Sequence, residues 1–184
     1  MHPSMADFDA IHNIYTGRHL YQFYKSAEDF YHILIPYFQS GLEKDEACLW
    51  LVSDPMGVEE AINLCDDQIP RFWFYFASGQ FQILSAENWY LADGVFDEAK
   101  AMANAQGYAM QILSQGYKRL RGAGDAGAIP KRDWPRMHAY EQKIHSWIRA
   151  SPMIALCAYP IIECSLFDTK SIVTSHDDVL AGHF

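Results

Sequence analysis

Three side chains that can bind metal recur along one segment predicted to be helical. His138, Glu141 and His145 stand at i, i+3 and i+7, so they share one face of a helix. Imidazole and carboxylate groups in such an arrangement bind metal ions in helical bundles. The sequence supplies no second cluster of ligands to complete a site, and a solvated polar face on an amphipathic helix is the simpler interpretation. No metal site is therefore predicted.

Single side chains elsewhere could carry acid–base or nucleophilic chemistry. His19 begins a predicted strand and could bind a ligand, a metal ion or a proton, or simply tie down the strand by a hydrogen bond. Asp125 follows another strand, where an acid can hold Mg²⁺ in a nucleotide enzyme, although a locally bonded turn aspartate is the simpler interpretation. Cys157 and Tyr159 suggest a nucleophile, but a cysteine inside an apolar strand is expected to be buried and inert.

The segment from residue 19 to residue 54 is predicted to fold as strand, tight turn, helix and strand. In nucleotide-binding proteins, this turn carries glycines, a lysine and a hydroxyl residue. Here the turn, residues 24–29, has no glycine and places two carboxylates where phosphate would sit. The patterns GxSxG, HExxH and GxGxxG are also absent. The architecture is thus of nucleotide-binding type without nucleotide chemistry, which favours binding over turnover.

The helix of this opening unit has local start and stop signals. Ser26 is expected to cap it and Asp29 to complete a capping box. Pro36 lies inside the helical pattern and is predicted to kink or break it, and Gly41 is a plausible C-terminal stop. A buried stripe is predicted at Phe30, Ile33, Leu34, Tyr37, Phe38 and Leu42.

Composition limits the class of protein. With 184 residues, half of them apolar, the chain suits one domain, predicted as residues 16–184 after a flexible lead-in over residues 1–15. A net charge of −9 disfavours direct contact with nucleic acid. No apolar run approaches the ~20 residues that span a bilayer, and no secretion signal is recognisable. The four cysteines lack CxxC spacing and are predicted to be reduced thiols in a cytoplasmic protein.

Further along the chain, strands and helices alternate. Strands are predicted near 81–85, 118–123, 153–159 and 179–184, helices near 58–68, 97–115, 133–148 and 167–175, and an Ω-like loop over 85–96, with 71–77 unassigned. This order predicts an α/β fold with a mainly parallel sheet flanked by helices. Ligands of such folds bind beyond the carboxyl ends of the strands, which selects Phe23, Tyr24, Ser53, Asp54, Asp125 and Tyr159.

Five segments together resemble a known family: HLYQFY, FQSGLEKDEACLWLVSD, GQFQILSAENWYLADGVFD, ALCAYPI and SHDDVLAGHF. They look like the MEDS domain, the sensory domain of methanogens and methylotrophs named for a regulator of dichloromethane use, over residues 17–184. The resemblance implies a RecA/KaiC-like three-layer sandwich that has lost its phosphate-binding loop and senses small molecules. Family members often carry a histidine-kinase or DNA-binding output domain. None follows here, so a separate partner of that kind is expected.

The resemblance also points to individual positions. Recurring family positions fall on His19, Phe23, Tyr24, Trp50, Glu87, Trp89, Tyr90, Tyr140 and Glu141. One departure matters, because the family commonly has an acidic-Met-Ser-Trp segment where this chain has residues 125–128, Asp-Ala-Gly-Ala. The smaller side chains could enlarge or reshape the site, so the ligand need not be the family's.

Three hypotheses of different classes follow. The favoured one is a binding module in which a small, largely apolar organic molecule enters a cleft at the strand carboxyl ends and orders residues 85–96. Its predicted ligand-binding residues are His19, Phe23, Tyr24, Trp50, Asp54, Glu87, Trp89, Tyr90, Asp125 and Tyr159. The second is an enzyme that uses His19 with Asp125 or Glu87.

The third hypothesis is a structural or interaction protein acting in trans. Its aromatic side chains would be ordinary core, with no pocket near Tyr24 and Trp89 and an exposed apolar patch elsewhere. The favoured hypothesis names no catalytic residue and no cofactor, and it expects no contact with a membrane. An exposed final strand could pair in a homodimer.

Overall fold

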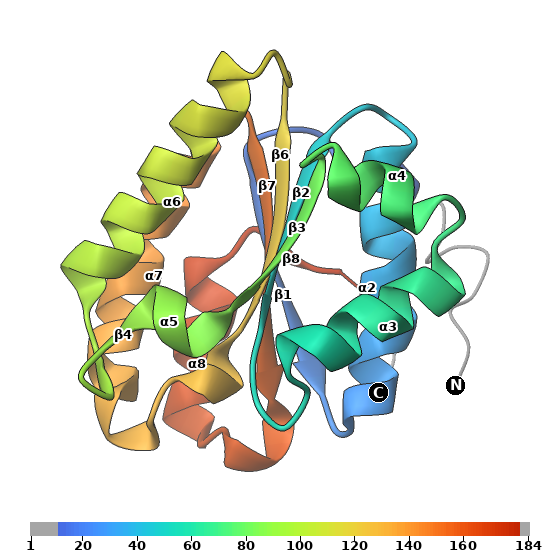
Figure 1. The fold of residues 1–184 in the computed structure, drawn as a ribbon. Helices are drawn as coiled ribbons and strands as arrows, with labels where there is room; N and C mark the ends of the chain where they lie inside the picture. The colour runs from blue at the N-terminus through green and yellow to red at the C-terminus, as the bar shows by residue number, and fades with distance from the viewer. Residues whose placement is uncertain (1–10, 181–184) are drawn as a thin grey trace.

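A six-stranded parallel sheet runs through the centre of the computed structural model, which describes residues 11–180 (Figure 1). Its strand order is β3-β2-β6-β7-β1-β8. The strands are β1 (Arg18–Tyr24), β2 (Ala47–Val52), β3 (Phe81–Ser85), β6 (Leu120–Asp125), β7 (Met153–Pro160) and β8 (Asp178–Val179). A separate antiparallel pair is formed by β4 (Leu91–Ala92) and β5 (Val95–Phe96).

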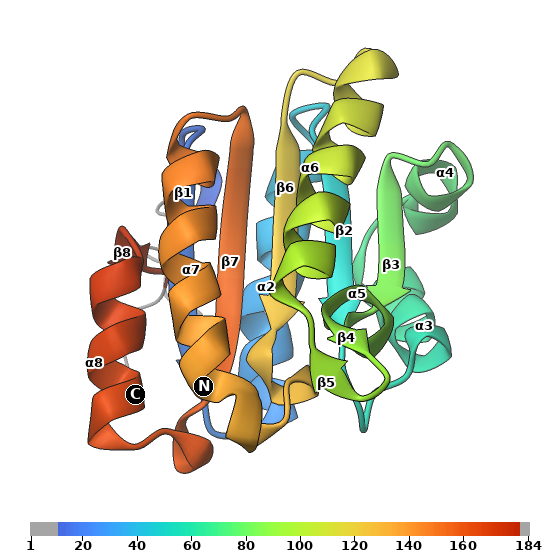
Figure 2. The same ribbon diagram turned by 90° about the vertical axis from the view of Figure 1, so that its left-hand side faces the viewer.

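Helices cover both faces of the sheet, as Figures 1 and 2 show from two directions. One layer contains α2 (Ala27–Leu42), α3 (Val58–Gln68) and α4 (Phe72–Ala77). The other contains α5 (Ala86–Tyr90), α6 (Glu98–Ser114), α7 (Trp134–Arg149) and α8 (Leu166–Ser175). The predicted α/β class and three-layer sandwich are therefore confirmed.

Strand alternation divides the core into two halves. On β7, Ile154 and Leu156 belong to the half under α2, whereas Ala155 and Tyr159 belong to the half under α7. All six residues of β2 are buried, as expected of a parallel strand covered on both faces. Any side chain on a central strand therefore faces one helical layer or the other, and this decides which predicted residues can meet.

Two local signals in the first helix are overridden by packing. Ser26 accepts a hydrogen bond from the backbone of Asp29, as predicted, but Pro36 lies inside a continuous α2. The prediction of a break is wrong, and the apolar stripe of the helix is buried on both sides of Pro36. Gly41 does not end the helix either, since α2 continues to Leu42. A Cβ at Gly41 would lie 2.7 Å from the side chain of Arg121. The glycine is needed for close packing.

Three other predictions either differ from the structure or fall partly outside the described residues. The Ω-like loop over 85–96 is instead α5 followed by the β4–β5 hairpin, and 71–77 contains the helix α4. The last strand is only Asp178–Val179, and residues 181–184 lie outside the described part. The lead-in is described only from residue 11, and Ile11 is buried. No helix within residues 11–180 has both the length and the apolar character to cross a membrane.

One ion pair is fully enclosed beneath α2. Arg121 Nε donates to Glu46 Oε2 at 2.6 Å, and both side chains are buried. The guanidinium also lies over the Tyr37 ring, 4.8 Å from its centroid. Its two Nη atoms have no hydrogen-bond partner among the described residues. Glu46 is thus the main compensation for a charge removed from water.

Replacing Glu46 should therefore lower the free energy of unfolding far more than replacing a neighbouring exposed acid. We expect Glu46→Ala to lower the free energy of unfolding by about 3–5 kcal/mol, because Arg121 would remain buried without its partner. Urea denaturation measures this change. Glu43→Ala is the matched control, since that exposed carboxylate accepts a hydrogen bond from Gln39 at the surface, and it should change stability by about 0.5 kcal/mol or less. Equal effects of the two substitutions would contradict the assignment.

Candidate functional site

A small cavity lies between the sheet and the helical layer of α5, α6 and α7. Its volume is about 60 Å³, and its walls are predominantly apolar. The sheet contributes residues from β2, β6 and β7, and the helices contribute aromatic and aliphatic side chains. The cavity therefore sits over the middle of the sheet and not beyond the carboxyl ends of its strands, where the cleft was expected.

Two glycines on β6 make room for this cavity. Gly122 and Gly124 both line it, and neither has a side chain to fill the space above the sheet. A Cβ at Gly124 would collide with the hydroxyl of Tyr90, and one at Gly122 would lie 3.2 Å from the terminal methyl of Met153. The pattern Gly-Ala-Gly thus leaves the α6–α7 face of β6 bare, while Ala123 packs on the opposite face.

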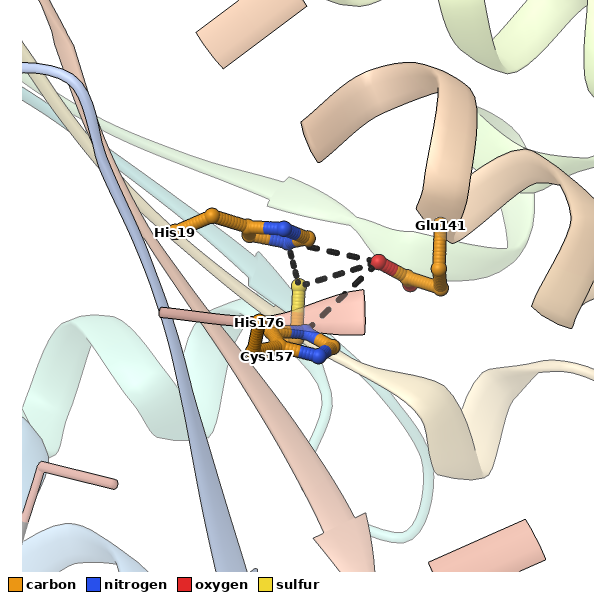
Figure 3. Close-up of side chains that lie close together, drawn as sticks. All are labelled: His19, Glu141, Cys157 and His176. Atoms are coloured by element: carbon orange, nitrogen blue, oxygen red, sulfur yellow. Dashed lines mark hydrogen bonds and ion pairs between the residues drawn. The ribbon is translucent and has the colours of Figure 1, made fainter. Parts of the chain in front are cut away.

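Four side chains that can bind metal or protons meet at the edge of the cavity (Figure 3). His19 comes from β1, Glu141 from α7, Cys157 from β7 and His176 from the residue after α8. His19 Nε2 lies 3.3 Å from both Cys157 Sγ and Glu141 Oε2. Glu141 Oε2 also lies 3.7 Å from His176 Nε2 and 3.9 Å from Cys157 Sγ. We refer to these four residues as the His–Glu–Cys–His cluster.

Burial and mutual charge set the protonation states in the cluster. Burial alone would raise the pKa of Glu141, but the hydrogen bond from His19 and the adjacent imidazoles outweigh it and lower that pKa. Burial and the charge of His19 lower the pKa of His176 to about 3. Burial and the Glu141 carboxylate raise the pKa of Cys157 well above its ordinary value. At neutral pH, Glu141 is ionised, His176 is neutral and Cys157 is a thiol.

The tautomer of His176 is set by a backbone contact. Its Nδ1 lies 2.7 Å from the carbonyl oxygen of Ile172, so Nδ1 carries the proton and donates it. The other nitrogen, Nε2, then presents a lone pair toward the cluster. This Nε2 is buried without a hydrogen-bond donor among the described residues, which leaves a buried acceptor unsatisfied.

The cluster does not have the geometry of a nucleophile–base–acid relay. Such a relay needs the nucleophile at one imidazole nitrogen and the carboxylate at the other. Here Cys157 and Glu141 both face Nε2 of His19, and Nδ1 of His19 has no hydrogen-bond partner among residues 11–180. A thiol held in this way is not activated by the histidine as a catalytic cysteine would be.

The enzyme hypothesis also fails to bring its residues together. His19 is paired with Ala155 of β7 and Asp125 with Ala158, so they are offset by about 10 Å along the strands and lie on opposite sides of β7. Glu87, at the start of α5, accepts hydrogen bonds from the backbone of Asp54 and from a nearby serine hydroxyl. Neither proposed pairing with His19 occurs.

Four of the predicted ligand-binding residues lie at the carboxyl edge of the sheet, namely Tyr24, Asp54, Glu87 and Asp125. Asp125 accepts hydrogen bonds from Tyr24, Ser53 and the backbone of Gly127, while Asp54 and Glu87 are joined as described above. Burial raises the pKa of Asp125 despite these bonds. The carboxylate is thus held by one backbone N–H of its own turn and by two hydroxyl groups from other segments.

The predicted aromatic residues are divided between the two faces of the sheet. Trp89 and Tyr90 line the cavity together with His19. Phe23 is core under the same helical layer, and Tyr159 is fully buried there with its ring 5.8 Å from that of His176. Trp50 lies on the opposite face, in the half of the core under α2, and so cannot reach the cavity.

Two of the three polar residues singled out on α7 do not lie on its solvated face. His138 and Glu141 are only 6% and 5% exposed, so that interpretation is wrong for both. Glu141 belongs to the cluster, whereas His138 bonds to Asp168 at 2.9 Å. The ring of His145 lies 5.5 Å from that of His19. The sequence did contain a signal that Glu141 is buried, since this residue interrupts an apolar stripe of α7.

Comparison with protein families identifies the chain. A family model described as MEthanogen/methylotroph, DcmR Sensory domain matches residues 18–177. The chain belongs to the MEDS family. The matched region contains all four residues of the His–Glu–Cys–His cluster and the strands that bear the cavity. MEDS is a sensory domain family, so a role in sensing and regulation is supported. No curated protein sequence matches the chain.

The contact between α7 and α8 gives a prediction about acid stability. Asp168 completes a capping box with Ser165 and accepts from Lys131 and His138. Burial would raise its pKa, but these hydrogen bonds hold it well below the ordinary value. Because the folded pKa is depressed, the stabilisation is present above the unfolded pKa of about 4 and is lost as pH falls below it.

We expect Asp168→Asn to lower the free energy of unfolding by about 1–3 kcal/mol at pH 7. The difference from wild type should shrink as pH falls below about 4, because the Asp168 carboxylate of the unfolded chain then takes up a proton, whereas that of the folded chain does so only at lower pH. Chemical denaturation over this pH range measures it. Asp66→Asn, at an exposed position on α3, is the control and should change stability little at any pH. A difference that stays constant with pH would refute the ionic contribution.

Proposed function

We propose that this MEDS domain senses a small, largely apolar organic molecule bound in the cavity between the sheet and α5–α7. The observation that carries the proposal is the cavity itself, which has predominantly apolar walls and a polar edge where His19, Glu141 and Cys157 of the cluster line it. Apolar walls with a few placed polar groups are typical of small-molecule sites. No NTP hydrolysis is part of this proposal, because the turn after β1 lacks the glycines that close around phosphate.

The size of the cavity limits the ligand. Sites for drug-sized ligands usually measure about 300–1,000 Å³, several times the 60 Å³ found here. An apolar cavity of about 150 Å³ holds benzene. The present cavity therefore suits molecules of roughly one to three carbon atoms by the same scale. A nucleotide or a flavin would not fit without a large rearrangement of α6 and α7.

The cluster connects the cavity to a helix that could carry the signal outward. His176 directly follows α8 and touches Glu141. The N-terminal turn of α8 exposes Leu166 and Phe167, which are 92% and 71% accessible. A ligand that binds better when the end of α8 is held in place would shift the population toward that state. A separate histidine kinase or DNA-binding regulator that contacts α8 would then read the change.

The interaction-protein hypothesis keeps partial support from the same surface. It expects an exposed apolar patch, and Ile162 together with Leu166 and Phe167 provides exposed apolar side chains. It also expects no pocket beside Trp89, yet Trp89 lines the cavity. A sensor that acts on a separate partner accounts for both observations.

Filling the cavity should abolish ligand binding while the fold persists. We expect Gly122→Val to weaken binding of small probes by at least about tenfold, because its side chain would occupy space that the ligand needs. A panel of alcohols and chloroalkanes of about one to three carbons, screened by ligand-detected NMR, measures this. Thermal denaturation would verify that the variant remains folded.

Gly107→Ala is the matched control for this experiment. A Cβ at Gly107, on α6, meets nothing within 4 Å, so binding should be unchanged and the helix slightly stabilised. Binding of a probe equally by wild type and by folded Gly122→Val would place the ligand elsewhere. Failure of every probe to bind the wild type would reject the size class proposed here.

A further inference from the structure

Four donor atoms from four separate elements converge at one point beneath α7 (Figure 3). Nε2 of His19, Oε2 of Glu141, Sγ of Cys157 and Nε2 of His176 all lie within 4.8 Å of one another. From this geometry we infer that the His–Glu–Cys–His cluster binds one divalent transition-metal ion of the zinc class. The inference goes beyond the sensing proposal, since it requires no organic ligand.

The separations match those of a tetrahedral site. Metal–ligand bonds of about 2.0–2.3 Å in a tetrahedron place the ligand atoms about 3.3–3.8 Å apart. Four of the six pairwise separations are 3.3, 3.3, 3.7 and 3.9 Å, and all six are at most 4.8 Å. Only small movements of side chains would be needed to admit the ion.

The donor set selects the class of metal. Two imidazoles, one sulfur and one carboxylate suit zinc and similar borderline ions, whereas Mg²⁺ and Ca²⁺ prefer oxygen ligands. A bound metal converts a coordinating thiol to thiolate, and its proton passes to solvent. The proton on Nε2 of His19 must also leave that nitrogen, so that the neutral imidazole carries its proton on Nδ1. Thiolate and carboxylate then neutralise a divalent cation, with both imidazoles neutral. The buried site would carry no net charge, which avoids the large cost of an uncompensated ion in the core.

The surroundings of the cluster also suit a metal. A ligating histidine usually donates its other N–H to a carbonyl or carboxylate, which fixes the tautomer. His176 does this through Ile172, and its Nε2 is left buried without a donor. An ion would satisfy this acceptor. The backbone of His19 is in turn held by Asp177 through two hydrogen bonds, so the segment after α8 is fixed against β1.

A bound ion would join four elements and border the cavity. It would fasten the end of α8 to β1, β7 and α7, which gives the proposed output helix a fixed position. His19, Glu141 and Cys157 line the cavity. A small molecule with a sulfur, oxygen or halogen atom could therefore approach the ion, which can expand from four to five ligands.

The test uses protein with any affinity tag removed and its metal stripped by a chelator. Co²⁺ is added first, because a tetrahedral thiolate site gives intense visible bands and a near-ultraviolet thiolate-to-cobalt absorption. Zn²⁺ then competes, and calorimetry gives the stoichiometry. We expect one ion per chain and both spectral features. Cys157→Ser should lose the thiolate absorption, and His176→Gln should bind at least about tenfold more weakly.

Two matched controls separate this site from incidental binding. Cys164→Ser removes a half-buried thiol outside the cluster, and His32→Gln removes an imidazole on α2, across the sheet. Both should bind Co²⁺ as wild type does. Circular dichroism and thermal melting of the metal-free variants exclude simple misfolding, and His176→Gln provides a second result if Cys157→Ser does not fold.

The inference is overturned if stripped wild type binds no stoichiometric ion, or if folded Cys157→Ser and His176→Gln bind it like the controls. This result is independent of the sensing proposal. If the wild-type protein binds a small probe but no metal ion, the metal site alone is refuted. The reverse result, a wild-type metal site with no probe bound, would refute the size class of the ligand alone.

Discussion

The carboxylate of Glu141 is the constraint on which this side of the molecule depends. It stands in the apolar stripe of α7, between the helix and the sheet, and is 5% exposed. An ionised group in such a place costs several kcal/mol unless it is paired. His19 supplies the pairing from β1 at 3.3 Å, and the ring of His176, the residue after α8, lies against the same carboxylate. The position of α7 over the sheet and the return of the chain after α8 are thus coupled to a single charge.

The two faces of the sheet are packed differently. Under α2, large rings such as Trp50, Phe38 and Phe81 fill the space between strands and helices. Under α6 and α7, Gly122 and Gly124 leave the sheet bare, and a cavity results. Close packing is the general rule in protein interiors, so a void retained beside a polar cluster sacrifices stability. The asymmetry places the cavity and the polar cluster on one face and densely packed rings on the other.

Sequence periodicity was sufficient for features that depend on neighbouring residues. The buried run of β2 and the capping of α2 by Ser26 follow from such local rules and are present in the structure. Pro36 and Gly41 were misjudged because their roles depend on tertiary packing. The cluster was missed for the same reason: its residues come from β1, α7, β7 and the end of α8. Strand register and the packing of α7 and α8 on the sheet bring them together, and no spacing pattern encodes that.

If the domain senses a very small molecule as proposed, its specificity must come from the cluster more than from the aromatic walls. An apolar pocket separates ligands that differ by one methylene by only about 1–3 kcal/mol. Buried polar groups discriminate far more strongly, because a wrong ligand leaves them unpaired. Trp89 and Tyr90 can therefore set the size limit of the cavity, while His19, Glu141 and Cys157 at its edge decide which functional group is accepted. In so small a cavity, these side chains supply the polar groups that a ligand would meet, and they also connect the cavity to the end of α8.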